Sequence, residues 1–109
     1  MTRKTLLLAS MIFAAAALPA SAAGNAEAGK KKAGQCQTCH GMDGMSKLPE
    51  APNLAGQNPI YLVRALSDYK SGARKNEMMS VIIGALSAED INDLAAYYAS
   101  IQITVTPPK

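Results

Sequence analysis

The residue types best suited to chemistry are gathered in one short stretch, Cys36-Gln37-Thr38-Cys39-His40. It holds the only two cysteines and the only histidine of the 109 residues. A Cys-x-x-Cys-His sequence is the attachment signature of haem c. Each thiol adds across one vinyl group of the haem to form a thioether, and the adjacent histidine then lies under the ring. The stretch therefore predicts one haem c bound covalently through Cys36 and Cys39, with His40 as an iron ligand.

Two other readings of this stretch are a redox-active dithiol and half of a zinc site. A structural zinc site needs four nitrogen or sulfur ligands, and the chain has only three. A thioredoxin-like dithiol would sit near a βαβ pattern, and the sequence has no strand-like alternation of any length. A dithiol protein without haem therefore remains as the weakest alternative.

A haem iron held by one histidine has a second axial position, and its occupant governs the function. A second histidine is impossible because His40 is alone. Met42 and Met45 follow it too closely to reach the opposite face of the ring. Met78 and Met79 lie far enough along the chain to do so. Their spacing leaves both open as ligands, and a methionine pair can also serve as flexible core filler.

Three helical segments are expected to position these residues. Capping residues, glycines and helical spacing of apolar side chains predict them over 25–38, from Pro59 to Gly72 as the C-cap, and from the Ser87 cap to about Ile101. Glycines and prolines punctuate 41–56 and predict a loop that wraps the haem edge. We expect 74–79 to be a short polar segment, and leave 81–85 open between a helical turn and an extended connector. The fold class is all-α, with about three main helices.

The first 22 residues resemble a secretory signal. Arg3 and Lys4 precede an uncharged apolar run from Leu6 to Leu18, and Ala20-Ser-Ala22 has the small-residue pattern of a cleavage site. We expect cleavage after Ala22 or Ala23, export to a bacterial periplasm, and one haem-binding domain over 23–109. The run is short for a membrane span, and no other stretch is apolar enough, so no span is expected after cleavage.

Composition narrows the classes of partner. Two of the eleven basic residues lie in the leader, so the remaining chain has nearly balanced charges. No basic stripe with interleaved aromatics is present, which gives nucleic-acid binding little support. The chain has no tryptophan, and its single phenylalanine is in the leader. A domain this small often needs a staple, and a bound haem would supply the bulky centre of the core.

Beyond these features, the chain resembles the class I c-type cytochromes over nearly all of residues 24–101. It is similar to the short monohaem cytochrome c553 type and to the single-haem halves of the dihaem cytochromes c4. The segments that carry the resemblance are Asn25-Ala-Glu-Ala-Gly29-Lys30, Cys36-Gln-Thr-Cys-His40-Gly41, Pro52-Asn-Leu-Ala-Gly56-Gln57, Tyr61-Leu62, Tyr69-Lys-Ser-Gly72-x-Arg74, Met79, and Leu86-Ser87-Ala-Glu-Asp90-Ile91 leading to Leu94-Ala-Ala-Tyr97-Tyr98.

The resemblance implies specific roles at the iron. In the family the axial methionine comes seven residues before the Leu-Ser that opens the last helix, which selects Met79 over Met78. A proline carbonyl in the loop accepts a hydrogen bond from the axial histidine, and the matching residue is Pro52. Arg74 would lie near the haem propionates, although a plain surface role fits it equally.

The resemblance also implies a close crossing of the first and last helices, with a glycine facing an aromatic side chain. Gly29 against Leu94 or Tyr97 fits this expectation. It would explain a glycine that otherwise costs helix stability. The implied fold is a small class I cytochrome c fold, with helices and loops wrapped around one covalently attached haem.

An iron held by histidine and methionine has no open position for a substrate. The sequence therefore predicts a soluble one-electron carrier, not an enzyme, with the iron cycling between Fe(II) and Fe(III). Its partners would be redox proteins that dock transiently at the haem edge. The alternatives are a cytochrome subunit of a larger dehydrogenase or oxidase complex, and a haem enzyme or gas-binding protein with a dissociable methionine.

Overall fold

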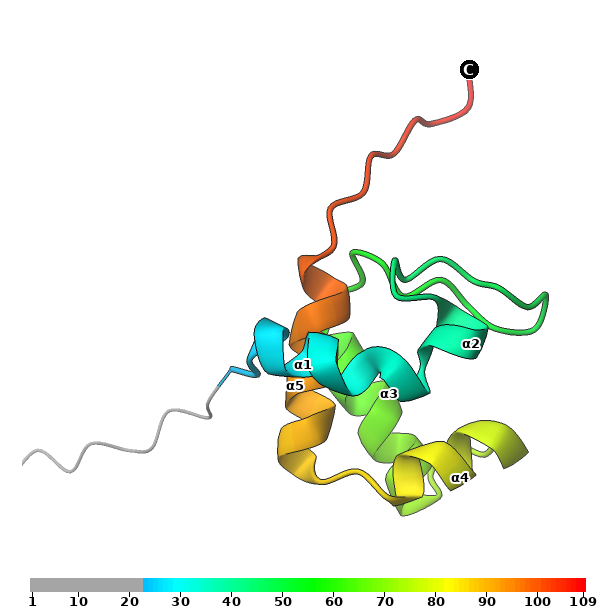
Figure 1. Cartoon of the computed structure of the whole chain (residues 1–109). Helices are drawn as coiled ribbons and strands as arrows, with labels where there is room; N and C mark the ends of the chain where they lie inside the picture. Colours follow the sequence, from blue (N-terminus) through cyan, green and yellow to red (C-terminus); the bar gives the residue numbers. More distant parts are fainter. Residues whose placement is uncertain (1–22) are drawn as a thin grey trace, which may run out of the picture.

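Helices connected by loops make up the structure, a computed structural model that describes residues 23–109 (Figure 1). The described chain contains no strand, which confirms the all-α fold class. The expected signal at 1–22 lies outside the described residues. Among the residues that are described, no helix combines the length and hydropathy needed to cross a bilayer. The helical elements in order are α1 (Ala26–Lys32), the 3-10 helix η1 (Ala33–Gln35), α2 (Gln37–His40), α3 (Pro59–Ser71), α4 (Glu77–Gly84) and α5 (Ala88–Ser100).

The first predicted helix is interrupted. Asn25 caps α1 as expected, and its side chain accepts a hydrogen bond from the N–H of Ala28 at 3.0 Å. The single helix predicted over 25–38 is wrong, because the chain tightens into η1 after Lys32. There the N–H of Cys36 donates to the carbonyl of Ala33, the shorter bond of a 3-10 turn. Helix α2 then begins afresh and carries the two cysteines and the histidine.

Helix α3 has the termini that the sequence predicts. The Asn58 side chain accepts hydrogen bonds from the N–H groups of Ile60 and Tyr61, and Pro59 occupies the first turn. Gly72 ends the helix in the left-handed conformation with φ of 84°. One buried side chain of α3, Leu62, anchors it to the core.

Helix α4 corrects the prediction for 74–79. Asn76 is an N-cap whose side-chain oxygen accepts a hydrogen bond from the N–H of Met79 at 3.0 Å, so the helix already begins at Glu77. The segment from 81, left undecided above, continues it to Gly84. Two adjacent β-branched isoleucines after a valine lower helix propensity, and packing of Ile83 in the core overrides that preference.

Helices α1 and α5 cross at very short distance. A Cβ added to Gly29 would lie 2.0 Å from the carbonyl oxygen of Asp93 and 2.8 Å from Cβ of Tyr97. This confirms the expected contact with Tyr97, while the main chain of Asp93 fills the other side of the glycine. Because backbone atoms cannot move aside as a flexible side chain can, only glycine fits here.

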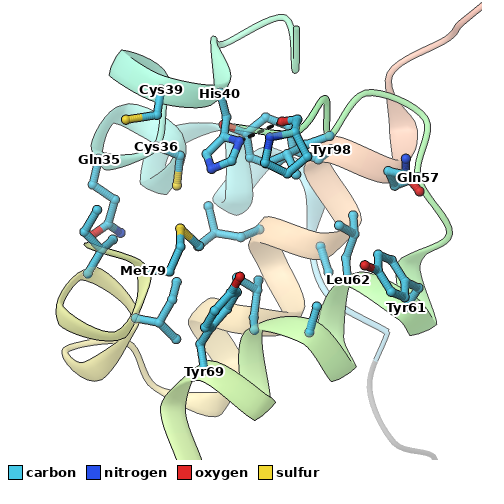
Figure 2. A pocket seen from close by; sticks show the side chains of 18 of the residues that line it. Gln35, Cys36, Cys39, His40, Gln57, Tyr61, Leu62, Tyr69, Met79 and Tyr98 are labelled. Atoms are coloured by element: carbon cyan, nitrogen blue, oxygen red, sulfur yellow. Dashed lines mark hydrogen bonds between the residues drawn. The ribbon is translucent and has the colours of Figure 1, made fainter. Parts of the chain in front are cut away.

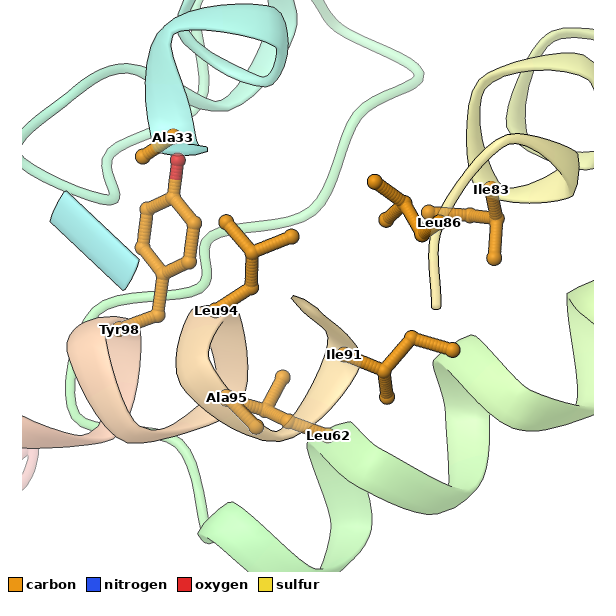
Figure 3. Packing of buried hydrophobic residues seen from close by; sticks show 8 residues of the cluster. All are labelled: Ala33, Leu62, Ile83, Leu86, Ile91, Leu94, Ala95 and Tyr98. Atoms are coloured by element: carbon orange, nitrogen blue, oxygen red, sulfur yellow. The ribbon is translucent and has the colours of Figure 1, made fainter. Parts of the chain in front are cut away.

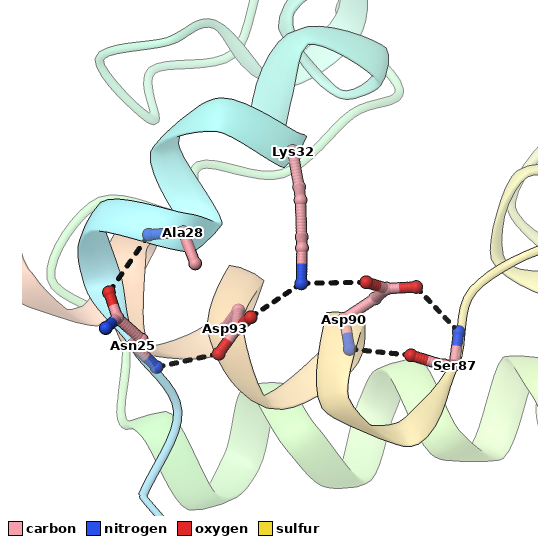
Figure 4. Close-up of polar contacts among 6 residues, drawn as sticks. All are labelled: Asn25, Ala28, Lys32, Ser87, Asp90 and Asp93. Carbon is pink, nitrogen blue, oxygen red and sulfur yellow. Dashed lines mark hydrogen bonds and ion pairs between the residues drawn. The ribbon is translucent and has the colours of Figure 1, made fainter.

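An ion-pair network reinforces the same crossing (Figure 4). Lys32 Nζ lies 2.6 Å from Asp93 Oδ2 and 2.8 Å from Asp90 Oδ1. Asp93 Oδ1 also accepts a hydrogen bond from the N–H of Asn25 at 2.7 Å. The ammonium of Lys32 and the capping hydrogen bonds from Ser87 lower the pKa of Asp90 to about 2. Lys32 likewise lowers the pKa of Asp93, and the two carboxylates raise that of Lys32.

The hydrophobic core lies between α3, α4, α5 and Ala33, the first residue of η1 (Figure 3). The predicted α5 stripe is buried at Ile91, Leu94 and Tyr98, and Ile101 packs at its edge. The whole cluster is Ala33, Leu62, Ile83, Leu86, Ile91, Leu94, Ala95 and Tyr98. Tyr98 is its only aromatic member. The small side chains leave a hollow on the side where α2 faces α4.

Candidate functional site

The hollow is a cavity enclosed by α2, the loop after it, α3, α4 and α5 (Figure 2). The empty space between its walls, counted out to the open mouth, is about 1050 Å³. Most of the lining is apolar, and its members are Gln35, Cys36, Cys39, His40, Pro52, Asn53, Leu54, Gln57, Tyr61, Leu62, Ala65, Leu66, Tyr69, Arg74, Met78, Met79, Ile82, Ile83, Leu94, Ala95 and Tyr98.

The two cysteines lie on one face of α2. Cys36 is its N-cap and Cys39 follows one turn later, a spacing that puts two side chains beside each other. Both thiols line the cavity, are partly buried, and are not joined in a disulfide. Burial raises the pKa of the Cys36 thiol. The pair is therefore two separate thiols presented to one apolar space.

His40 ends α2 and is buried, with 7% of its surface exposed. Its Nδ1 lies 2.9 Å from the carbonyl oxygen of Pro52, the hydrogen bond that the family resemblance implied (Figure 2). Because a carbonyl only accepts, Nδ1 carries the proton and Nε2 keeps its lone pair. A metal-binding histidine typically has this arrangement, since the bond fixes the ring and raises its basicity.

The loop over 41–56 is held by its own backbone, with Gly44 at its centre. The N–H groups of Leu54 and Ala55 both donate to the Gly44 carbonyl, at 2.7 and 3.0 Å. The N–H of Lys47 donates to the carbonyl of Cys39 at 2.8 Å. These bonds close the loop on itself and bring the Pro52 carbonyl back to His40.

Met79 lies across the cavity from His40, and Figure 2 shows its sulfur directed into the space below the imidazole. It is partly buried, whereas Met78 also borders the cavity but is 63% exposed. Met42 and Met45 are outside the lining. The structure thus brings Cys36, Cys39, His40 and Met79 to one cavity, from two helices widely separated in sequence.

Arg74 joins the lining between two tyrosines. Its guanidinium lies 3.5 Å from the hydroxyl of Tyr61 and 4.9 Å from the ring centre of Tyr69. The hydrogen bond with Tyr61 and the nearby Tyr69 raise the pKa of Arg74, so it stays a cation. Tyr61 and Gln57 belong to the segments that carry the family resemblance, which assigned them no role. Both line the cavity.

The residues present fit a covalent haem c. The cavity offers two thiols one helical turn apart, an apolar lining for a flat macrocycle, and an imidazole whose free nitrogen is Nε2. A thioether faces it from the opposite wall, the combination found in cytochromes c. The cysteines would hold the ring, and His40 and Met79 would hold its iron.

Comparisons with known proteins point the same way. The family model described as cytochrome c matches residues 26–102. The chain is 45% identical over 86 residues to cytochrome c4 of Pseudomonas aeruginosa, covering 79% of this chain and 43% of that protein. It is 46% identical over 81 residues to cytochrome c-554(548) of Halomonas halodenitrificans, covering 72% of this chain and 98% of that one.

A solved structure is similar as well. The reduced recombinant cytochrome c4 from Pseudomonas stutzeri superposes with a TM-score of 0.70 at 41% identity, covering 76% of this chain and 48% of that one. The chain thus spans about half the length of the cytochromes c4 that it matches. Because the family model covers most of the described residues and includes the haem attachment sequence, the chain belongs to the cytochrome c family, whose cofactor here is one haem c.

Proposed function

We propose that this chain is a one-electron carrier in which Cys36 and Cys39 bind haem c covalently and His40 and Met79 are the axial ligands of its iron. The observation that carries the proposal is the single cavity that receives all four side chains. His40 and Met79 would hold the iron from opposite walls of the cavity. Neither side would then offer a substrate a place to bind.

Each residue has a distinct task in this function. The bound haem supplies the Fe(II)/Fe(III) couple. The thioethers of Cys36 and Cys39 keep it in place in both oxidation states. His40 is held in one orientation by Pro52, so its ligand field stays constant. Met79 completes the coordination with a weak donor, which raises the potential relative to stronger donors. The carrier needs no general acid, base or nucleophile.

The apolar lining supports outer-sphere transfer because it excludes water from the iron. Because fewer water dipoles must then reorient when the charge changes, the reorganisation energy of electron transfer is lower. Electrons would leave through the mouth of the cavity, where exposed Met78 and Tyr61 border it. Transient redox encounters use small interfaces, and partner redox proteins would dock briefly at this mouth.

The expected leader favours a location outside the cytoplasm. We propose that 1–22 directs export and is removed, and that 23–109 works as a single domain in a bacterial periplasm. The apolar run and the small-residue cleavage pattern support this. Mass spectrometry of the exported protein tests it: a haem-bearing chain that still begins at Met1 would contradict cleavage.

Spectroscopy of the purified protein tests the iron site. We expect a pyridine haemochrome spectrum of haem c that survives denaturation, and an oxidised-state band of the sulfur–iron bond. Met79→Ala should abolish that band and let the reduced iron bind CO. The matched control is Met78→Ala, which removes the neighbouring thioether and should keep the band. A wild-type protein that binds CO readily at neutral pH would refute a closed carrier site and favour an enzyme or gas-binding protein.

A second candidate is a cytochrome subunit of a larger complex. The observation that favours it is the similarity of the chain to part of the thiosulfate dehydrogenase from Marichromatium purpuratum, with a TM-score of 0.68 at 31% identity, covering 86% of this chain and 23% of that one. Size-exclusion chromatography of a native extract separates the two. A free carrier elutes at the size of one small domain, whereas a subunit co-elutes with a dehydrogenase or oxidase activity.

A further inference from the structure

Two adjacent tyrosines of α5 hold the main chain that leaves His40. The hydroxyl of Tyr98 donates to the carbonyl of Gly41 at 3.2 Å. The hydroxyl of Tyr97 donates to the carbonyl of Met42 at 2.7 Å. Their ring centres are 5.1 Å apart with planes tilted by 57°, so the two phenols reach two successive carbonyls. One helix therefore binds the carbonyls of the two residues that directly follow the proposed iron ligand.

These hydrogen bonds lie in a protected place. Tyr98 is 3% exposed, Gly41 is buried, and Tyr97 is half-buried. Burial raises the pKa of Tyr98, so its hydroxyl keeps the proton that it donates. Removing a donor from a buried carbonyl leaves that group unsatisfied, which costs more than the loss of an exposed hydrogen bond.

The segment held by the tyrosines has little slack. Gly41 turns the chain with φ of 72°, and a Cβ there would lie 2.3 Å from Asp43 Oδ1 and 2.7 Å from the Met45 carbonyl oxygen. A tight, close-packed turn transmits displacement to its neighbour. Any movement of the carbonyl of Gly41 therefore also moves the backbone of His40.

We propose that Tyr97 and Tyr98 are positioning residues for His40, fixing its main chain while Pro52 fixes its imidazole. The proposal rests on the proposed role of His40 as the axial ligand. The ring of His40 is thereby held from two directions: its Nδ1 by the loop carbonyl, and its backbone by α5. The tyrosine hydroxyls act through Gly41 and Met42, and not by touching the iron.

Tyr97 gives the cleaner test of the two. Tyr98 lines the cavity, so its removal changes both the chain and the haem surroundings. Tyr97 lies outside the lining. Its hydroxyl bonds to the Met42 carbonyl, and Tyr97→Phe removes that bond while keeping the ring that packs against Tyr98. An effect of Tyr97→Phe at His40 therefore reports positioning alone.

The experiment measures hydrogen exchange by NMR in the reduced haem-loaded protein. Tyr97→Phe, Tyr98→Phe and the double variant each keep the aromatic ring and lose only hydroxyls. We expect the His40 Nδ1–H and the Lys47 N–H to exchange about two- to tenfold faster per hydroxyl removed. The core amides of Leu62 and Leu94 should keep their wild-type rates, because only the loop opens.

Ser100→Ala is the matched control. The Ser100 hydroxyl donates to the Tyr97 carbonyl at 2.6 Å, so this variant deletes a hydroxyl hydrogen bond from α5 without touching the loop. It should leave exchange at His40 unchanged. If Tyr97→Phe behaves like Ser100→Ala in a haem-loaded protein with intact ligation, the positioning role is wrong while the electron-carrier proposal stands.

Two further outcomes would overturn the inference. Equal acceleration at His40 and at the core amides would make the tyrosines general stabilising residues. A wild-type protein without haem c, detected by the pyridine haemochrome spectrum before any variant is made, would end both the carrier proposal and the role of His40 on which the inference rests. The order of the measurements keeps these failures distinguishable.

Discussion

The two walls of the cavity are built very differently. The His40 wall is a buried imidazole on a chain segment fixed by the Pro52 carbonyl and by hydroxyls of α5. The Met79 wall is a partly exposed thioether in the first turn of α4, a short helix with one buried side chain, Ile83. Local stability follows buried contacts and protected hydrogen bonds. One proposed ligand is therefore held by several hydrogen bonds, and we expect the other to lie on an element that opens more easily.

This difference indicates which side of the iron site is more sensitive to changes in the surrounding protein. The ammonium of Lys70, on α3, donates to the carbonyls of Gly84, the last residue of α4, and of Leu86 just beyond it. Together with Ile83 and the Asn76 cap, this exposed lysine holds the methionine's helix. Changes that weaken α4 should reach Met79 and spare His40.

Substitutions of the two proposed iron ligands should have the largest and most unequal effects. His40→Ala removes an axial ligand and leaves the Pro52 carbonyl without its donor. Losing even an indirect partner of a metal ligand typically costs about 10–100-fold in metal affinity or activity, so we expect at least a tenfold loss in the fraction of chains carrying haem. Met79→Ala should keep covalent haem, since Cys36, Cys39 and His40, the whole attachment stretch, remain. Absorbance of haem per protein measures both, and equal losses would contradict the asymmetry.

The next largest effect is expected at the helix crossing behind His40. Gly29→Ala puts a methyl group 2.0 Å from the Asp93 carbonyl oxygen, and α1 and α5 must separate to accept it. We expect the free energy of unfolding to fall by about 3 kcal/mol, at the upper end for overpacking. Urea denaturation measures this.

Gly34→Ala is the control for that change, because a Cβ at Gly34 meets nothing within 4 Å. It should alter the free energy of unfolding by less than about 0.5 kcal/mol. Equal losses at Gly29 and Gly34 would mean that glycine matters there for backbone freedom and not for close packing.

Sequence patterns predicted the features that are local or that repeat in the family. The His40 wall has a strong signal because covalent attachment needs two cysteines and a histidine at fixed spacing. The bond to Pro52 and the close approach of Gly29 to Tyr97 followed from the resemblance, and the structure confirms both. Caps at Asn58 and Ser87 were readable because a side chain binds the helix next to it.

Features that depend on distant segments escaped prediction. The continuation of α4 through two isoleucines reflects packing of Ile83 that overrides local propensity, whereas the start of α4 had a local signal, the Asn76 cap, that was missed. The hydrogen bond from the Tyr97 hydroxyl to the carbonyl of Met42 joins residues far apart in sequence. Helical spacing indicated only that the tyrosine was near the core. No sequence pattern indicates where the hydroxyl of a tyrosine points.

A smaller effect is expected from removing the N-cap of α4, the helix that carries Met79. Asn76→Ala removes the cap that accepts the N–H of Met79 itself, and a lost N-cap costs about 1 kcal/mol. We expect the sulfur–iron band to weaken at lower temperature or denaturant than in wild type. Asn58→Ala deletes the corresponding cap of α3 and is the matched control. If both variants shift the band equally, α4 is not the locally weak element.

The smallest expected effect is the pH dependence contributed by the Lys32 network behind the His40 wall. The folded pKa of Asp90, about 2, lies below its ordinary value of 3.8, and that of Asp93 is also lowered. A depressed carboxyl pKa adds stability that is fully present above the ordinary value and is lost as pH falls towards the folded pKa. We expect the unfolding midpoint to decline between about pH 4 and pH 2 in wild type, and less steeply in Lys32→Met.

Lys47→Met is the control, because it breaks the exposed pair with Asp43 at 3.1 Å and leaves the crossing intact. Since Asp90 and Asp93 touch α1 and α5 but not α4, acid should loosen the helix crossing before it affects the sulfur–iron band. If the sulfur–iron band is lost at a higher pH than the pH at which the chain unfolds, the Met79 wall is the first part of the site to open in acid.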